Sequence, residues 1–145
     1  MTTDGATIQS WLESFIAAQG GVAGTVHRVI DDGAALASVA TVNIPPQVQA
    51  VTAVVPRGKG MAGLALEREE PVSTCNLADD RSGDVRPGAK AVAAQAAVAL
   101  PLRDGAKIWA VVGIAFAQER DWSREELDAL AHAAASLTDA CRDAD

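Results

Sequence analysis

The chain has 145 residues, of which 49% are apolar, and its formal net charge at neutral pH is −7. This length predicts a single domain over residues 1–145 that is large enough to bury a hydrophobic core. The acidic balance argues against a nucleic-acid partner, which needs clustered basic residues, and no apolar run approaches the roughly 20 residues needed to cross a bilayer, so no membrane partner is expected either.

The N-terminal segment carries no targeting signal and leads into the first predicted helix. Residues 1–5 lack the basic residues of a secretory leader, and no apolar leader segment follows, which predicts a cytoplasmic location. Apolar residues then recur at i, i+3, i+4, i+7 and i+8, which predicts a helix over about 7–19 that Gly20-Gly21 ends. The members of this apolar stripe are Ile8, Trp11, Leu12, Phe15 and Ile16.

An antiparallel hairpin is predicted next, because Asp31-Asp32-Gly33 is typical of a tight turn between two strands. Pro45-Pro46 then begins a short segment that is compatible with a helix to about Val51. The strands predicted in this part of the chain cover residues 23–30, 34–42 and 53–56.

The segment Gly58-Lys59-Gly60-Met61-Ala62-Gly63 satisfies the G-x-G-x-x-G pattern of dinucleotide-binding sites. That pattern belongs in a βαβ unit of a parallel sheet, whereas the hairpin signals here are typical of antiparallel strands. Pro56 also interrupts the strand just before the glycines. We therefore predict a sharp strand-to-helix turn, with positive φ or close backbone approach at each glycine, and no nicotinamide or flavin binding.

The second half of the chain combines one long loop with three more strands and a final helix. Residues 77–90 have no hydrophobic period and suit a lid or a long connection. Ser123-Arg124-Glu125-Glu126 is a capping box, which predicts a helix start, and an apolar stripe follows as far as Cys141. The other elements predicted here are a helix over 61–69, strands over 71–76, 96–102 and 107–117, and a helical turn over 91–94.

Six strands, two of whose connections are tight, predict an α+β domain built on a six-stranded antiparallel sheet. The two terminal helices carry one apolar stripe each and should cover one face together. Residues 61–69 and the loop over 77–90 are left to cover the other face. A face covered in this way closes less tightly, and the small alanines over 91–97 leave space, so we expect a small-molecule pocket there.

The order of these motifs resembles the GAF domain family over nearly the whole chain. The resemblance implies a three-layer α/β/α fold with a central six-stranded antiparallel sheet, the N- and C-terminal helices on one face, and a ligand pocket on the other. The residues that carry it are Val54 to Ala65, Glu70-Pro71-Val72, Asn76-Leu77-Ala78-Asp79-Asp80, Ala99 to Gly105 and Val111 to Phe116.

The chain lacks the residues that three known activities of that family require. The branch that reduces free methionine sulfoxide uses several cysteines around the glycine turn and the following loop, but here Met61 lies in the turn and no cysteine occurs over 76–140. The bilin-binding branch uses a histidine in the later loop, and no histidine lies between Arg28 and Ala131. The N-K-F-D-E signature of the cyclic-nucleotide binders is missing too. The cofactor therefore stays unknown.

The resemblance favours a non-catalytic sensory domain, with a degenerate methionine sulfoxide reductase or a pure dimerisation module as the alternatives. The sequence contains no kinase, cyclase or DNA-binding segment, so signalling would run through a partner chain. We also expect a homodimer, because the terminal helices offer more apolar surface than one sheet face can bury, and exposed apolar patches mark interfaces. The residues behind this expectation are Trp11, Phe15, Leu130, Ala134 and Leu137.

Basic residues gather on the segments that would form the rim of the pocket, and a helix N-terminus there favours anions. One interpretation is an anionic group on a small ligand; the other is a solvated rim balanced by neighbouring aspartates. Cys75 is either a reactive thiol or a small buried apolar residue. His27 and His132 have no spaced partners, so we expect ordinary surface or half-buried histidines and no metal. The candidate ligand-binding residues are Arg57, Lys59, Cys75, Asn76, Asp79, Arg86, Lys90 and Gln95.

Overall fold

The computed structural model of the chain describes residues 5–74, 96–118 and 122–143. The loop predicted over 77–90 and the helical turn predicted over 91–94 lie outside these residues. In chain order the elements are α1 (Gly5–Gln19), β1 (Ala23–Ile30), a 3-10 turn (Asp31–Gly33), β2 (Ala35–Val42), α2 (Pro46–Val51), β3 (Val54–Pro56), α3 (Gly60–Arg68), β4 (Val72–Thr74), β5 (Ala96–Asp104), β6 (Lys107–Phe116), α5 (Arg124–Ala134) and α6 (Ser136–Asp143).

The strands form one six-stranded sheet in the order β3-β2-β1-β6-β5-β4. Every neighbouring pair is antiparallel, which confirms the predicted sheet and the two predicted hairpins. The first strand and the last strand are thus neighbours at the centre, although most of the chain separates them. No parallel βαβ unit occurs among these strands, so the glycine-rich segment does not have the context of a dinucleotide site.

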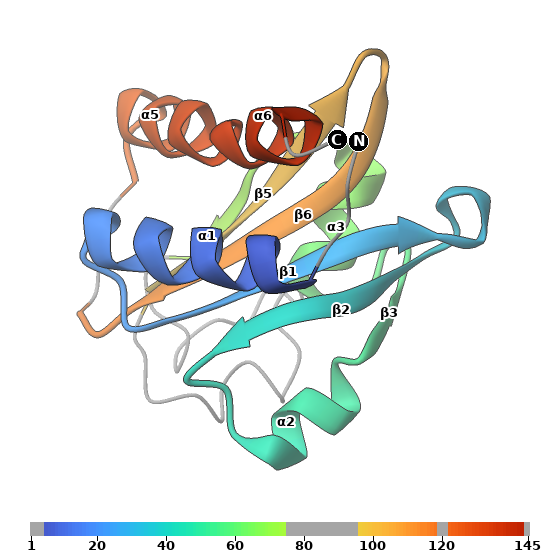
Figure 1. Cartoon of the computed structure of the whole chain (residues 1–145), viewed down its shortest axis with the longest axis horizontal. Helices are drawn as coiled ribbons and strands as arrows, with labels where there is room; N and C mark the ends of the chain where they lie inside the picture. The colour runs from blue at the N-terminus through green and yellow to red at the C-terminus, as the bar shows by residue number, and fades with distance from the viewer. Residues whose placement is uncertain (1–4, 75–95, 119–121, 144–145) are drawn as a thin grey trace.

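The helices cover the sheet in layers, as Figure 1 shows: α1 and α5–α6 lie on one face, α3 lies behind the sheet, and α2 lies beyond the edge near β2 and β3. Strand residues alternate between the two faces, so each face has its own apolar cluster. The larger cluster joins the terminal helices to the sheet and includes Ile8, Leu12, Val26, Leu100, Val112, Ile114 and Leu137. The smaller one lies under α3 and includes Leu36, Val55, Leu66, Val72 and Val111.

A β-bulge in the hairpin of β5 and β6 brings a tryptophan to the helical face. The register shifts between Leu102, which pairs with Ala110, and Arg103, which pairs with Ile108, so Trp109 is the extra residue. Its indole Nε1–H donates a hydrogen bond of 2.8 Å to Thr138 Oγ1 on α6. The bulge thereby ties the last helix to the central strand.

The C-terminal helix, predicted as one piece, is divided into α5 and α6 at Ala135. Ser136 explains the division, because its hydroxyl donates to the carbonyl of Ala133 at 2.8 Å and competes there with the regular backbone pattern. The same hydroxyl accepts the indole N–H of Trp11 at 2.9 Å. The break in the helix is therefore a contact point with α1.

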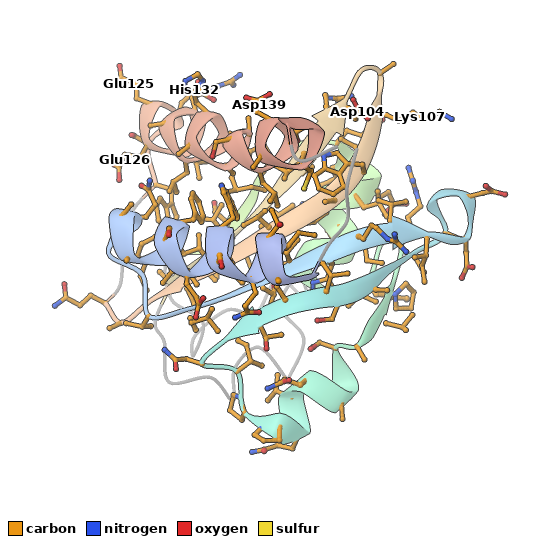
Figure 2. All side chains as sticks on the ribbon, viewed as in Figure 1. Asp104, Lys107, Glu125, Glu126, His132 and Asp139 are labelled. Carbon is orange, nitrogen blue, oxygen red and sulfur yellow. The ribbon has the colours of Figure 1, made fainter. Side chains whose placement is uncertain are left out.

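The apolar residues expected to form an exposed patch on the terminal helices are mostly buried inside the chain. Phe15 and Leu130 are each 5% exposed, while Ala134 and Leu137 are fully buried. The outward side of α5–α6 is polar, and Figure 2 shows Glu125, His132 and Asp139 pointing away from the sheet. The expected exposed patch is thus absent on these residues, because the sheet and α1 cover them, while the homodimer itself stays a prediction.

None of the helices in the part of the chain that the structure describes is both long enough and apolar enough to cross a membrane.

The capping box at the start of α5 gives a first test of local stability. Ser123 Oγ accepts the backbone N–H of Glu126 at 3.1 Å. We expect Ser123→Ala to lower the free energy of unfolding by about 1 kcal/mol, because the N–H loses its partner. Urea unfolding measures the change. Ser10→Ala, at an exposed position inside α1, is the matched control and should not destabilise the protein. Equal stability of both variants would contradict the cap.

Candidate functional site

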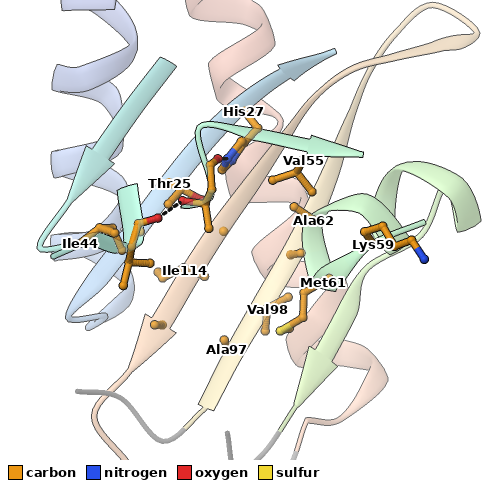
Figure 3. A pocket seen from close by; sticks show the side chains of 17 residues that line it. Thr25, His27, Ile44, Val55, Lys59, Met61, Ala62, Ala97, Val98 and Ile114 are labelled. Atoms are coloured by element: carbon orange, nitrogen blue, oxygen red, sulfur yellow. Dashed lines mark hydrogen bonds between the residues drawn. The ribbon is translucent and has the colours of Figure 1, made fainter. Parts of the chain in front are cut away.

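A cavity of about 150 Å³ lies on the sheet face that carries α3. Its floor comes from β1, β6 and β5, and its walls come from α3 on one side and from α2 with the segment before it on the other. Figure 3 shows Met61 of α3 and Ile44 before α2 on opposite sides of this floor. The cavity therefore joins the central strands to the two short elements between β2 and β4.

Strand register places small residues in two rows across the floor. One row is Thr25, Gly113 and Ala99, and the other contains Ala115 and Ala97. At Gly113 an added Cβ atom would lie 2.9 Å from Thr25 Oγ1, so the space over this row depends on glycine. Hydrogen bonding of the strands fixes the rows, and the hollow is therefore a property of the sheet itself.

The glycine turn sets the position of the α3 wall. Gly58 and Gly60 have φ values of +79° and +64°, which side chains rarely adopt. Gly63 instead permits close approach, because an added Cβ atom would lie 2.4 Å from the carbonyl oxygen of Pro56. The N–H of Gly58 donates to the carbonyl of Gly63 at 2.9 Å and closes the turn. The predicted strand-to-helix turn is thus confirmed at all three glycines.

His27 of β1 holds the end of α2 against the sheet. Its side chain is 3% exposed, and Nε2 lies 2.8 Å from the carbonyl oxygen of Thr52. Because a carbonyl can only accept, Nε2 carries the proton and donates. The hydroxyl of Thr52 donates in turn to the carbonyl of Val48 at 2.9 Å. The α2 wall is therefore joined to the floor through one buried imidazole.

The surroundings of His27 keep its ring neutral. Burial lowers the pKa of the imidazole, and the hydrogen bond to the Thr52 carbonyl opposes that effect only in part. Nδ1 is buried and has no hydrogen-bond partner within the described residues. Protonation would place a positive charge at this atom in an apolar site, which is costly.

Two of the eight candidate ligand-binding residues fall in the described part of the chain, and the structure does not bring them together. Lys59 is an exposed residue of the cavity lining, and Figure 3 shows its side chain pointing away from the floor. Arg57 lines a separate hollow with Asp32, Glu69 and other residues, and donates to the carbonyl of Gly33 at 3.3 Å. Cys75, Asn76, Asp79, Arg86, Lys90 and Gln95 lie outside the described residues, and their roles stay predictions.

The sequence interpretation missed three polar residues of the lining: Thr25, His27 and Thr52. Strand alternation could have found two of them, because Thr25 and His27 are two residues apart on β1 and share a face. His27 was expected to be a surface or half-buried residue, whereas it is buried. Among the described residues, no group of three His, Cys, Asp or Glu side chains could hold a metal ion.

Comparisons with known proteins agree with this architecture. A family model described as GAF domain matches residues 6–141. No curated protein sequence matches the chain. The family match therefore spans nearly the whole chain.

Several solved structures share the fold at low sequence identity. The GAF domain of Acinetobacter phosphoenolpyruvate-protein phosphotransferase has a TM-score of 0.74 at 15% identity, covering 97% of this chain and 82% of that one. The second GAF domain of DevS from Mycobacterium smegmatis has a TM-score of 0.71 at 20% identity, with coverages of 97% and 95%. Free methionine-R-sulfoxide reductase from Neisseria meningitidis, solved with its substrate, has a TM-score of 0.74 at 16% identity, with coverages of 99% and 83%.

Proposed function

The chain belongs to the GAF domain family, and from this premise we propose that it is a non-catalytic sensory domain that binds a small molecule in the cavity between α2, α3 and the sheet. The observation that carries the proposal is the floor of small residues, which strand register holds open at the centre of the sheet. A concave, mostly apolar site with few polar groups is the usual form of a small-molecule site. Signalling would then pass to a partner chain.

The non-catalytic assignment is supported by the position of the cysteine that the structure describes. Cys141 is fully buried on α6, within the cluster on the opposite face of the sheet from the cavity. Burial raises the pKa of its thiol, and a protonated thiol is a poor nucleophile. The solved reductases are similar to this chain at 13% and 16% identity, which shows a shared fold and carries no argument about activity in either direction.

Filling the cavity tests the proposed function directly. Ala97 is a half-buried residue of the floor. We expect Ala97→Leu to abolish ligand binding, because the added carbon atoms occupy the space, while the melting temperature without ligand is kept or raised. A ligand at a hundred times its dissociation constant should stabilise the wild type by about 2.7 kcal/mol. A thermal-shift screen of amino acids, nucleotides, small acids and neutral aromatics measures both effects.

The matched control for this experiment is Ala37→Leu, the same substitution on β2 at a residue outside the cavity lining. It should leave every thermal shift unchanged. If no compound stabilises the wild type, and native mass spectrometry of freshly purified protein finds no bound molecule, the sensory function is wrong and the dimerisation module takes its place.

The homodimer through the terminal helices is the second part of the proposal. The apolar surface still available there centres on Trp11, which is half-buried and stacks on Phe15 with ring centroids 4.8 Å apart. Light scattering at micromolar concentration should give twice the mass of the chain. Trp11→Gln should shift this mass toward the monomer. If the wild type is a monomer at that concentration, the dimer proposal is wrong, whereas the cavity proposal is unaffected.

A further inference from the structure

The side chains and backbone that line the cavity have a consistent chemical character. Apart from three neutral polar residues and one lysine, the lining consists of glycine, alanine and larger apolar residues. The larger apolar members on this face are Ile44, Val48, Val55 and Met61, while Val98 and Ile114 border the cavity although they belong to the cluster under the terminal helices. Such a surface recognises a ligand by exclusion of water and by shape rather than by charge.

The polar atoms beside the cavity are largely occupied by bonds within the protein. His27 Nε2–H is held by the Thr52 carbonyl, and the Thr52 hydroxyl is held by the Val48 carbonyl. The first bond joins β1 to the end of α2, and the second closes the last turn of α2, so a ligand that took either partner would loosen the wall. His27 Nδ1 is buried beneath the surface and is not offered to a ligand.

The scarcity of charged residues in the described lining also argues against an ionised ligand. Among the described residues that line the cavity, Lys59 is the one with a charged side chain. That side chain points away from the floor. A carboxylate taken from water into an apolar site without a partner costs several kcal/mol. Among the described side chains of the walls, no charged group points into the cavity to offset that cost.

Resting on the proposed sensory function, we propose that the ligand is an uncharged, largely apolar molecule about the size of one aromatic ring. A cavity of about 150 Å³ with apolar walls is large enough for benzene. The small residues in the floor, Gly113 and the alanines, provide a flat apolar surface on which such a ring can lie. The anionic ligand expected from Arg57, Lys59, Arg86 and Lys90 is the competing outcome.

Toluene and benzoate test the inference, because they share a ring and differ in charge. Binding to the full chain is measured for each by NMR titration at neutral pH. We expect the dissociation constant of toluene to be at least tenfold lower than that of benzoate. Ala97→Leu should weaken toluene binding at least tenfold, whereas Ala37→Leu should change it less than twofold. If Ala97→Leu does not fold, Ala115→Leu fills the floor from the neighbouring strand.

The outcomes separate the ligand class from the sensory function. Tighter binding of benzoate than of toluene, with a loss on Lys59→Gln, overturns the uncharged ligand and leaves the sensory function standing. The uncharged ligand is also overturned if neither aromatic binds but a charged compound from the screen stabilises the wild type and not Ala97→Leu. If nothing binds the wild type, both proposals fall.

Discussion

Gly63→Ala is expected to lower the free energy of unfolding by about 2 kcal/mol. The added Cβ atom would lie 2.4 Å from the carbonyl oxygen of Pro56 and 3.2 Å from the backbone nitrogen of Gly58, so α3 or the turn must move. Relieving such a backbone overlap costs about 3 kcal/mol. Alanine gains about 1 kcal/mol over glycine in a helix, which does not offset that cost. For a chain of this length, the loss corresponds to roughly 4–8 °C in melting temperature.

The control for this prediction is Gly5→Ala, at the first residue of α1, where an added Cβ atom meets nothing within 4 Å. Its melting temperature should equal or exceed that of the wild type. Ligand binding should weaken in Gly63→Ala beyond the effect on stability, because Met61 and Ala62 of the displaced helix line the cavity. A Gly63→Ala protein as stable as the wild type would mean that α3 does not pack against the turn in solution.

Acid is expected to destabilise the protein as the pH falls below about 6.5, the ordinary pKa of histidine. The pKa of His27 is lowered in the folded state, mainly by burial, so the unfolded chain takes up the proton first. Above pH 6.5 the neutral ring makes its full contribution to the free energy of unfolding. This contribution is lost as the pH falls toward the lowered pKa. Within this window the free energy of unfolding should fall by up to about 1.4 kcal/mol per pH unit.

Urea unfolding at a series of pH values between 7.5 and 5.5 measures this slope. His27→Gln should be less stable at pH 7.5, because its shape and hydrogen bonding differ, but its slope should be much smaller. His132→Gln, at an exposed position on α5, is the matched control and should keep the slope of the wild type. An unchanged slope in His27→Gln would place the proton uptake elsewhere in the molecule.

The fold was largely predictable because its signals are local. The apolar stripe of α1 and the capping box at Ser123 define helix positions through short-range periodicity and hydrogen bonding. The glycine turn was predictable for a similar reason, since the positive φ at Gly58 and Gly60 favours glycine and so appears directly in the sequence. The break at Ser136 escaped prediction because it depends on contacts with α1 that periodicity does not contain.

The cavity was harder to derive because it depends on pairing between distant strands. Thr25, Ala99 and Gly113 are small residues without a shared motif, and only the register places them in one row. The ligand site predicted from basic residues depended on their positions in single segments of the sequence. In the structure Arg57 and Lys59 line different hollows, although they are two residues apart. The hydrogen bond of His27 to Thr52 likewise joins β1 to the end of α2.

The three tryptophans give this chain a built-in optical readout of communication across the sheet. Trp11, Trp109 and Trp122 all pack with the cluster under the terminal helices, and none of them lines the cavity. The indole N–H groups of Trp11 and Trp109 are both held by α6, through Ser136 and Thr138. A molecule bound among the floor residues would touch no indole. Any change in emission on binding would therefore report movement transmitted through the central strands to the opposite face, which is the event that a partner chain would have to detect.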